Sequence, residues 1–113
     1  MIKNKLISKN KMNIENVLKD WISSNVLSED GYFIKKIEKE NYKLTIFIVE
    51  DYYFRIRSNL TLTIFVEEND EEINVEVVSS GGKEGLAGFS YGAEKSAVKR
   101  VVKLLKENGF TEQ

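Results

Sequence analysis

The Gly-rich segment at residues 79–92 has the residue types and spacing closest to a chemical motif. It reads SSGGKEGLAGFSYG and holds five of the seven glycines, so the chain's turn chemistry is concentrated here. Consecutive backbone N–H groups at Gly81, Gly82 and Lys83 can hold a small anion, aided by a nearby helix N-terminus. Arg55 and Arg57 are cations that can complete such a site for a phosphorylated metabolite. This is one of two interpretations.

The other interpretation of the same segment is a hairpin. Gly81-Gly82 suits a tight turn, and residues 86–91 can return as a short strand with a bulge at Gly88. The Walker pattern and the dinucleotide-binding fingerprint are both absent. A structureless loop of this length would also be unusual in a compact domain. The sequence therefore favours the hairpin and leaves the anion-binding loop as the alternative.

Catalytic chemistry has few candidate residues. The chain has no Cys and no His, which excludes a disulfide framework, a thiolate zinc site and a cysteine nucleophile. The commonest general base and metal ligand is missing as well. Carboxylate pairs such as Glu50-Asp51 fall at expected turns or strand ends. We expect no catalytic residue, no metal and no cofactor; the sequence favours a non-catalytic protein and leaves enzymatic activity open.

The elements that position these residues follow from hydrophobic periodicity. Asn13 is a good N-cap for a first helix with apolar residues at helical spacing. Residues 32–78 are rich in Ile, Val, Thr, Tyr and Phe and predict four or five antiparallel strands, with one turn near Glu40-Asn41. A last helix follows the Gly-rich segment and ends at Gly109, with Phe110 placed to contact Leu105 in a Schellman motif.

Strand registers predict which side chains face the helices. A two-residue turn at Asn69-Asp70 opposes Val66 to Ile73 and aligns apolar residues on one face. A three-residue loop at residues 57–59 similarly opposes residues 52–56 to residues 60–64. Even-numbered side chains from Tyr42 to Val66 are then expected to point inward.

The opposite, outward face collects aromatic, hydroxyl and charged residues, with Arg57 at its edge. Its expected members are Phe47, Tyr53, Arg55, Thr61, Thr63, Phe65, Asn74, Glu76 and Val78. Such a face can bury itself against a partner or a second subunit, stay half-solvated, or stack nucleic-acid bases. Its apolar content favours a partner or self-association. The acidic residues 67–72 disfavour nucleic acid.

The fold class is therefore α+β, in the order helix, antiparallel meander sheet of four to five strands, and C-terminal helix, with both helices on one sheet face. Residues 13–113 form a single domain. Residues 1–12 are basic and predict a poorly ordered or short-strand N-terminus. They contain no signal-peptide apolar run, and no segment is long and apolar enough for a membrane helix, so we expect a cytoplasmic protein without membrane contact.

A family resemblance comes from the second half of the chain. The residues that carry it are Asp51-Tyr52-Tyr53-Phe54-Arg55, the threonine-alternating strand after Ser58-Asn59, Ser80-Gly81-Gly82 with Gly85, and Tyr91-Gly92-Ala93-Glu94. Together they resemble an uncharacterised family of small proteins from Gram-positive bacteria, over most of the chain from Ile14 onward. Members have a third Gly and a Gln at Lys83-Glu84, and a Trp at Tyr91. The resemblance supports the fold and implies no activity.

The leading functional hypothesis is a non-catalytic binding or interaction module, expected to be a homo-oligomer, that uses the outward sheet face. The alternative is a binder of a small anion or phosphorylated metabolite, or an enzyme acting on one. The candidate binding residues are Tyr53, Arg55, Arg57, Thr61, Thr63, Phe65, Gly81, Gly82 and Lys83.

Overall fold

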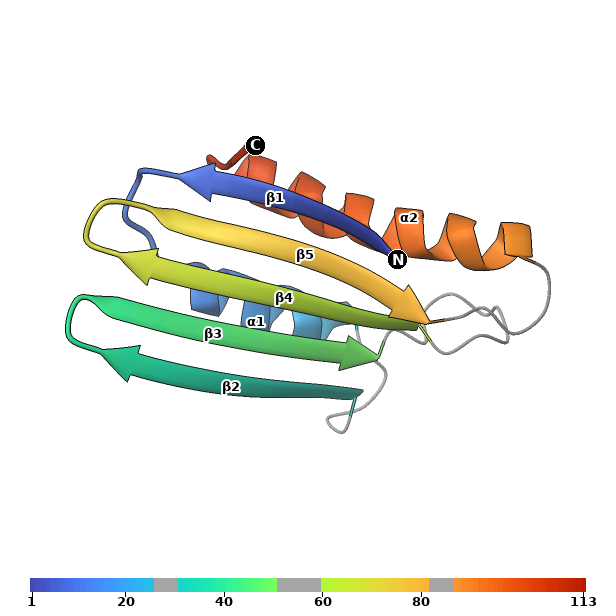
Figure 1. Ribbon diagram of the computed structural model, residues 1–113, viewed down its shortest axis with the longest axis horizontal. Helices are drawn as coiled ribbons and strands as arrows, with labels where there is room; N and C mark the ends of the chain where they lie inside the picture. Colours follow the sequence, from blue (N-terminus) through green and yellow to red (C-terminus); the bar gives the residue numbers. More distant parts are fainter. Residues whose placement is uncertain (26–30, 51–59, 82–86) are drawn as a thin grey trace.

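The computed structural model describes residues 1–25, 31–50, 60–81 and 87–113, with residues 81 and 87–94 described by their backbone alone. The elements are β1 (Ile2–Ser8), α1 (Ile14–Asn25), β2 (Tyr32–Lys39), β3 (Tyr42–Glu50), β4 (Leu60–Asn69), β5 (Ile73–Gly81), α2 (Ala87–Glu107) and β6 (Thr111–Glu112). The described strands form one antiparallel sheet in the order β2-β3-β4-β5-β1-β6. Both helices lie behind the same face of this sheet (Figure 1).

The predicted α+β class and antiparallel sheet are confirmed, but the element order is corrected. A strand, β1, precedes the first helix, and it pairs with β5 in a register that sets Leu6 opposite Val75. The pair β1–β6 adds a short sixth strand after α2. The sequence predicts either a poorly ordered or a short-strand N-terminus for residues 1–12, and the structure has a strand there. Local sequence could not decide between the two, because β1 pairs with a partner about 70 residues further along the chain.

The side-chain direction of β3 also differs from the prediction. Phe47 and Val49 are buried on the helix side, whereas Ile48 is 38% exposed on the other side. The reason is the register with β4, in which Phe47 lies opposite the buried Ile64. The partners of β4 also differ from the prediction of residues 52–56, since β3 occupies that side of residues 61–64; residues 52–56 themselves lie outside the described residues.

The hairpin between β4 and β5 keeps its predicted facing but shifts by two residues. Val66 pairs with Val75 instead of Ile73, and both remain buried. The connection is longer than two residues because the side chain of Asn69 organises it: Oδ1 accepts hydrogen bonds from the backbone N–H groups of Glu71 (2.8 Å) and Glu72 (2.9 Å). A shift of two preserves the face of every side chain.

Helix boundaries follow local hydrogen-bond chemistry. The Asn13 Oδ1 accepts from the Asn16 N–H at 3.1 Å, as an N-cap does. At the end of α2, the N–H of Gly109 bonds the carbonyl of Lys106 and that of Phe110 bonds Leu105, the Schellman pattern. Gly109 has φ +91°, and Phe110 is buried, as predicted.

The start of α2 contradicts the predicted second hairpin. The helix begins at Ala87, so the backbone of residues 87–91 is helical and is not a returning strand. Gly82 and Lys83 lie outside the described residues, so the structure does not address the anion-binding alternative there.

The core lies between the helix side of the sheet and the two helices. Its largest fully buried side chains come from β1, β3, β4, β5 and both helices: Phe47, Leu6, Ile14, Leu18, Ile22, Leu62, Ile64, Leu105, Val66, Val75, Val77 and Val101. The helices also contact each other through Arg100, whose guanidinium lies 5.5 Å from the Trp21 ring centroid and donates to Asn25 Oδ1 at 2.6 Å.

Candidate interaction surface

The face of the sheet opposite the helices, called here the open face, carries the large exposed apolar side chains of the β2–β3 hairpin. Phe33 is 58% exposed, Ile37 is 39% exposed and Ile48 is 38% exposed. In the view of Figure 1 this face is turned toward the reader, and α1 and α2 lie behind it. No described helix or strand covers it.

Strand pairing arranges the open face in rows that run across the sheet, since paired residues share a face. One row contains Lys35, Ile46, Phe65 and Glu76 on consecutive strands from β2 to β5. Its order is therefore a cation, two apolar side chains and an anion, and Lys5 on β1 extends the row as the residue opposite Glu76. Within the described residues neither Lys35 nor Glu76 takes part in an ion pair, although Lys5 lies opposite Glu76 on the neighbouring strand.

A second row contains Phe33, Ile48, Thr63 and Val78. A third row contains two apolar residues followed by an acidic and an amide residue: Ile37, Leu44, Glu67 and Asn74. The Glu67 carboxylate accepts a hydrogen bond from the Tyr42 hydroxyl at 2.8 Å, and this bond raises the pKa of Tyr42. The centre of the open face is thus apolar, with charged groups on either side.

Only some of the residues expected at a binding site can be placed. Thr61, Thr63 and Phe65 are half-buried on the open face, together with Asn74, Glu76 and Val78. Phe47, expected there, is buried beneath the helices. Gly81 ends β5, while Tyr53, Arg55, Arg57, Gly82 and Lys83 lie outside the described residues.

The residues missed by the sequence reasoning are Phe33, Ile37 and Ile48. Phe33, Lys35 and Ile37 alternate along one side of β2, and this alternation was the available signal. It predicts that the three share a face, but it does not reveal which face, because β2 carries apolar residues on both.

A charged cluster on the helix side ties α1 to the sheet. The Glu15 carboxylate, in the first turn of α1, is 7% exposed and lies 2.7 Å from Lys36 Nζ on β2 and 3.2 Å from Lys43 Nζ on β3. Burial alone raises the pKa of Glu15, but the hydrogen bonds and positive charges of both lysines outweigh burial and hold the pKa below its usual value. Burial likewise lowers the pKa of Lys43, and its bond to Glu15 and nearby carboxylates reverse the direction.

This cluster has the features of a structural contact. Lys19 adds a third ammonium group 3.5 Å from Glu15, and Lys43 lies 3.7 Å from Glu68. Each carboxylate of the cluster thus lies within ion-pair distance of a lysine, although Glu68 Oε2 is buried and has no hydrogen-bond partner. Within the described ranges, no group of three or more acidic, His or Cys side chains is arranged to hold a metal ion.

Comparisons with other proteins support the assignment to a family. Among the described residues, neither helix has the length and apolar character to span a bilayer. Searches of curated proteins and of solved structures found no match. Residues 3–109 do match a protein family, and over this nearly complete span the chain belongs to the family of unknown function DUF6054.

Proposed function

We propose that this protein is a non-catalytic interaction module that self-associates as a homodimer through the open face of its sheet. The observation that supports the proposal is the exposure of Phe33, Ile37 and Ile48 on one face that no described element covers. Removing a large apolar side chain from water contributes about 1.5–3 kcal/mol when burial is complete. Contiguous apolar patches of more than a few hundred Å² are uncommon on monomers and mark association surfaces.

The dimensions of the open face suit a dimer. The four strands β2–β5, about 4.8 Å apart and each paired over about eight residues that rise about 3.3 Å each, give roughly 19 by 26 Å, or about 500 Å² in plan. Protruding side chains raise the accessible area toward the roughly 800 Å² that each partner buries in a standard interface. Two such sheets can pack face to face about 10 Å apart, as in β-sandwiches.

Charge complementarity selects a second copy of this chain as the partner. Consider a two-fold axis parallel to the strands and midway between β3 and β4. It stacks β2 of one copy over β5 of the other, and β3 over β4. The row described above then sets Lys35 against Glu76 of the second copy and Ile46 against its Phe65. One row therefore supplies two intermolecular ion pairs around an apolar centre.

A charge exchange tests this arrangement. Lys35→Glu and Glu76→Lys each place like charges across the axis and should convert the dimer to monomer in sedimentation-velocity measurements at high micromolar concentration. The double variant Lys35→Glu/Glu76→Lys restores opposite charges and should restore the dimer. The matched controls are Lys9→Glu and Glu71→Lys, which make the same changes at exposed positions outside the open face.

Two results would overturn the proposal. One is a wild-type protein that stays monomeric throughout the concentration series. The other is a double variant that stays as dissociated as the single ones, because complementary pairing across the axis requires rescue. We further propose a cytoplasmic location in a Gram-positive bacterium, in keeping with the sequence expectations. That Ser80-Gly81-Gly82 is a motif of the family also stays a prediction.

A further inference from the structure

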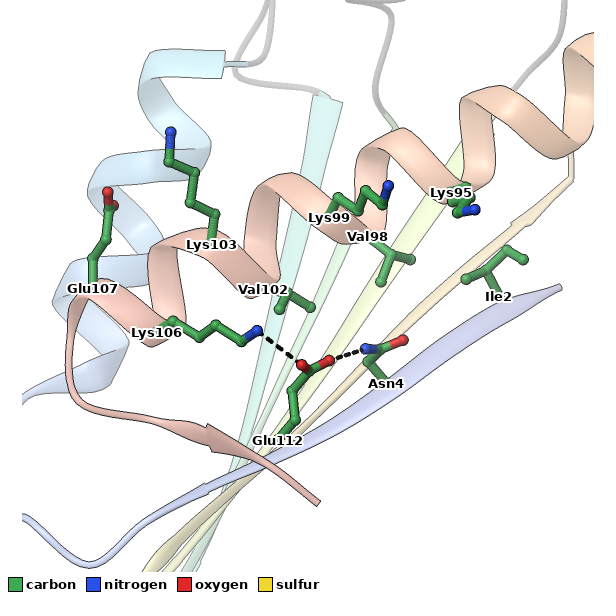
Figure 2. Close-up of a pocket in the computed structure, with 10 residues that line it drawn as sticks. All are labelled: Ile2, Asn4, Lys95, Val98, Lys99, Val102, Lys103, Lys106, Glu107 and Glu112. Carbon is green, nitrogen blue, oxygen red and sulfur yellow. Dashed lines mark hydrogen bonds and ion pairs between the residues drawn. The ribbon is translucent and has the colours of Figure 1, made fainter.

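A groove lies on the helix side of the sheet, between α2 and β1, remote from the open face (Figure 2). Its volume is about 790 Å³, within the range of small-molecule sites, about 300–1,000 Å³. Ile2 on β1 points toward α2, and Val98 and Val102 on α2 point back toward the strand (Figure 2). These three side chains form an apolar floor, and we call the feature the α2–β1 groove.

The groove exists because, in the row of the sheet that contains Asn4, the apolar core ends at β5, although Leu6 further along β1 is fully buried. Phe47, Ile64 and Val77 are paired neighbours on the helix side of the sheet and are fully buried. The next position across the sheet, on β1, is Asn4, which is polar and only half-buried. The facing side chains of α2 are valines, which are too short to fill the space above it.

One end of the groove is closed by a polar bridge. The Asn4 Nδ2 donates to Glu112 Oε1 at 2.6 Å, and Lys106 Nζ lies 2.8 Å from Glu112 Oε2. The Lys106 hydrogen bond and charge hold the pKa of Glu112 below its usual value, so the bridge is charged at neutral pH. The bridge connects β6, β1 and α2 and uses the negative charge of Glu112 internally.

The other end of the groove is positively charged. Lys95 and Lys99 are one helical turn apart on α2, at the end of the groove near Ile2, while Lys103 and Glu107 rise from the far side of the helix (Figure 2). Both Lys95 and Lys99 are exposed, and within the described residues neither has an ion-pair partner. Their methylene stems add apolar wall to the groove and leave the ammonium groups at its mouth.

We propose that the α2–β1 groove binds one molecule of an anionic amphiphile, an alkyl chain carrying a carboxylate or phosphate headgroup. The chain lies on Ile2, Val98 and Val102, and the headgroup contacts the ammonium groups of Lys95 and Lys99. An apolar floor beside two unpaired cations complements both parts of such a ligand, whereas inorganic phosphate would satisfy only the cations. The proposal does not depend on dimerisation, because the groove and the open face are on opposite sides of the sheet.

Calorimetric titration with monomeric surfactants tests ligand class. The probes are decanoate, decyl phosphate, the uncharged decyl maltoside and inorganic phosphate, each alkyl probe held below its critical micelle concentration. We expect 1:1 binding of decanoate or decyl phosphate, and the tighter of the two identifies the headgroup. Decyl maltoside and inorganic phosphate should bind at least about tenfold more weakly, which corresponds to about 1.4 kcal/mol.

Variants and amide chemical shifts locate the site. Lys95→Glu/Lys99→Glu should weaken binding of the anionic probe by about tenfold or more, whereas Lys9→Glu/Lys11→Glu, the same charge change outside the groove, should leave binding unchanged. Circular dichroism of both variants verifies folding. Probe-induced shifts should concentrate at Ile2, Val98 and Val102.

Several results would overturn the inference. These are no binding of either anionic probe, equal binding of decyl maltoside, binding of many probe molecules per chain, and equal weakening in the two double variants. Shifts confined to Phe33 and Ile48 would assign the probe to the open face instead. Binding to phosphatidylglycerol vesicles without binding of monomeric probe would indicate membrane-surface adsorption, and would likewise reject the groove as a ligand site.

Discussion

The matched substitutions Phe47→Ala and Phe33→Ala remove the same atoms from opposite faces of the sheet. Phe47 is fully buried beneath the helices, and Phe33 is 58% exposed on the open face. The two residues are close in the sheet, since Phe47 pairs with Ile34, the neighbour of Phe33. Their comparison therefore isolates burial as the variable and tests the facing of β2 and β3 directly.

The expected costs differ several-fold. Phe47→Ala loses the full transfer energy of the ring and leaves a cavity in a packed core, which costs about 3–5 kcal/mol. Phe33→Ala loses little burial, and its remaining cost, chiefly strand propensity, should stay below about 1 kcal/mol. A chain of 113 residues has a total stability of roughly 6–17 kcal/mol, so both variants should fold. At about 4 °C per kcal/mol, Phe47→Ala should lower Tm by roughly 12–20 °C.

Urea denaturation measures both variants. Far-UV circular dichroism reports the whole chain, and the fluorescence of Trp21, half-buried on α1, reports the helix side independently. Both variants should carry Glu76→Lys, so that a change in dimerisation does not enter the free energy of unfolding. Equal costs for the two variants, or a larger cost for Phe33→Ala, would refute the observed facing of β3 and with it the open face.

Substitutions at three further positions test local features of the fold. Glu15→Gln should destabilise by about 1–2 kcal/mol at pH 7, less than a fully buried pair because Lys36 and Lys43 are partly exposed. The folded pKa of Glu15 lies below its unfolded value of about 4.5. The stabilisation by Glu15 is therefore present above pH 4.5 and disappears as pH falls through the folded pKa. Urea titrations should show a smaller difference in the free energy of unfolding between wild type and Glu15→Gln at pH 3 than at pH 7. Gly109→Ala should lower the free energy of unfolding by about 1–2 kcal/mol, measured in thermal melts. The cost comes from backbone strain at φ +91° and not from a clash, since an added Cβ meets only ordinary contacts. An unchanged Tm would contradict this prediction. Asn13→Ala should cost about 1 kcal/mol by loss of the N-cap, whereas Asn13→Ser should retain most of the stability.

The two proposed surfaces have separable tests. The open face contains Lys35 and Glu76, and the α2–β1 groove contains Lys95 and Lys99, on opposite sides of the sheet. A variant that abolishes dimerisation should therefore still bind the anionic probe, and a groove variant should still dimerise. Loss of both properties in either variant would indicate a folding defect instead of a surface effect.

Sequence alone predicted features that depend on residues close together in the chain. The N-cap at Asn13 and the Schellman motif at Gly109 were both confirmed, because each uses hydrogen bonds within one helical turn. The inward facing of β4 and β5 was also predicted correctly. In β4 and β5 most polar and charged residues lie at alternate positions and therefore on one face of each strand. Only the opposite, apolar face of each strand can pack into the core.

Other features required the tertiary structure. β3 has apolar residues on both faces, so its alternation could not distinguish Phe47 from Ile48; pairing with Ile64 on β4 decided it. For the same reason only part of the candidate interaction surface could be predicted: Thr63 and Phe65 were placed, and Phe33 was missed. α2 begins at Ala87 although glycines follow at positions 88 and 92, where local propensity disfavours a helix.

The position of β1 depended most on long-range contacts. Its strand character and the α2–β1 groove beside it both arise from pairing with β5, about 70 residues away in the chain. Local sequence specifies which conformations a segment favours and which of its faces are apolar. It does not specify which distant segment will satisfy the backbone hydrogen bonds of a strand, and in this protein that choice determines both surfaces proposed to bind.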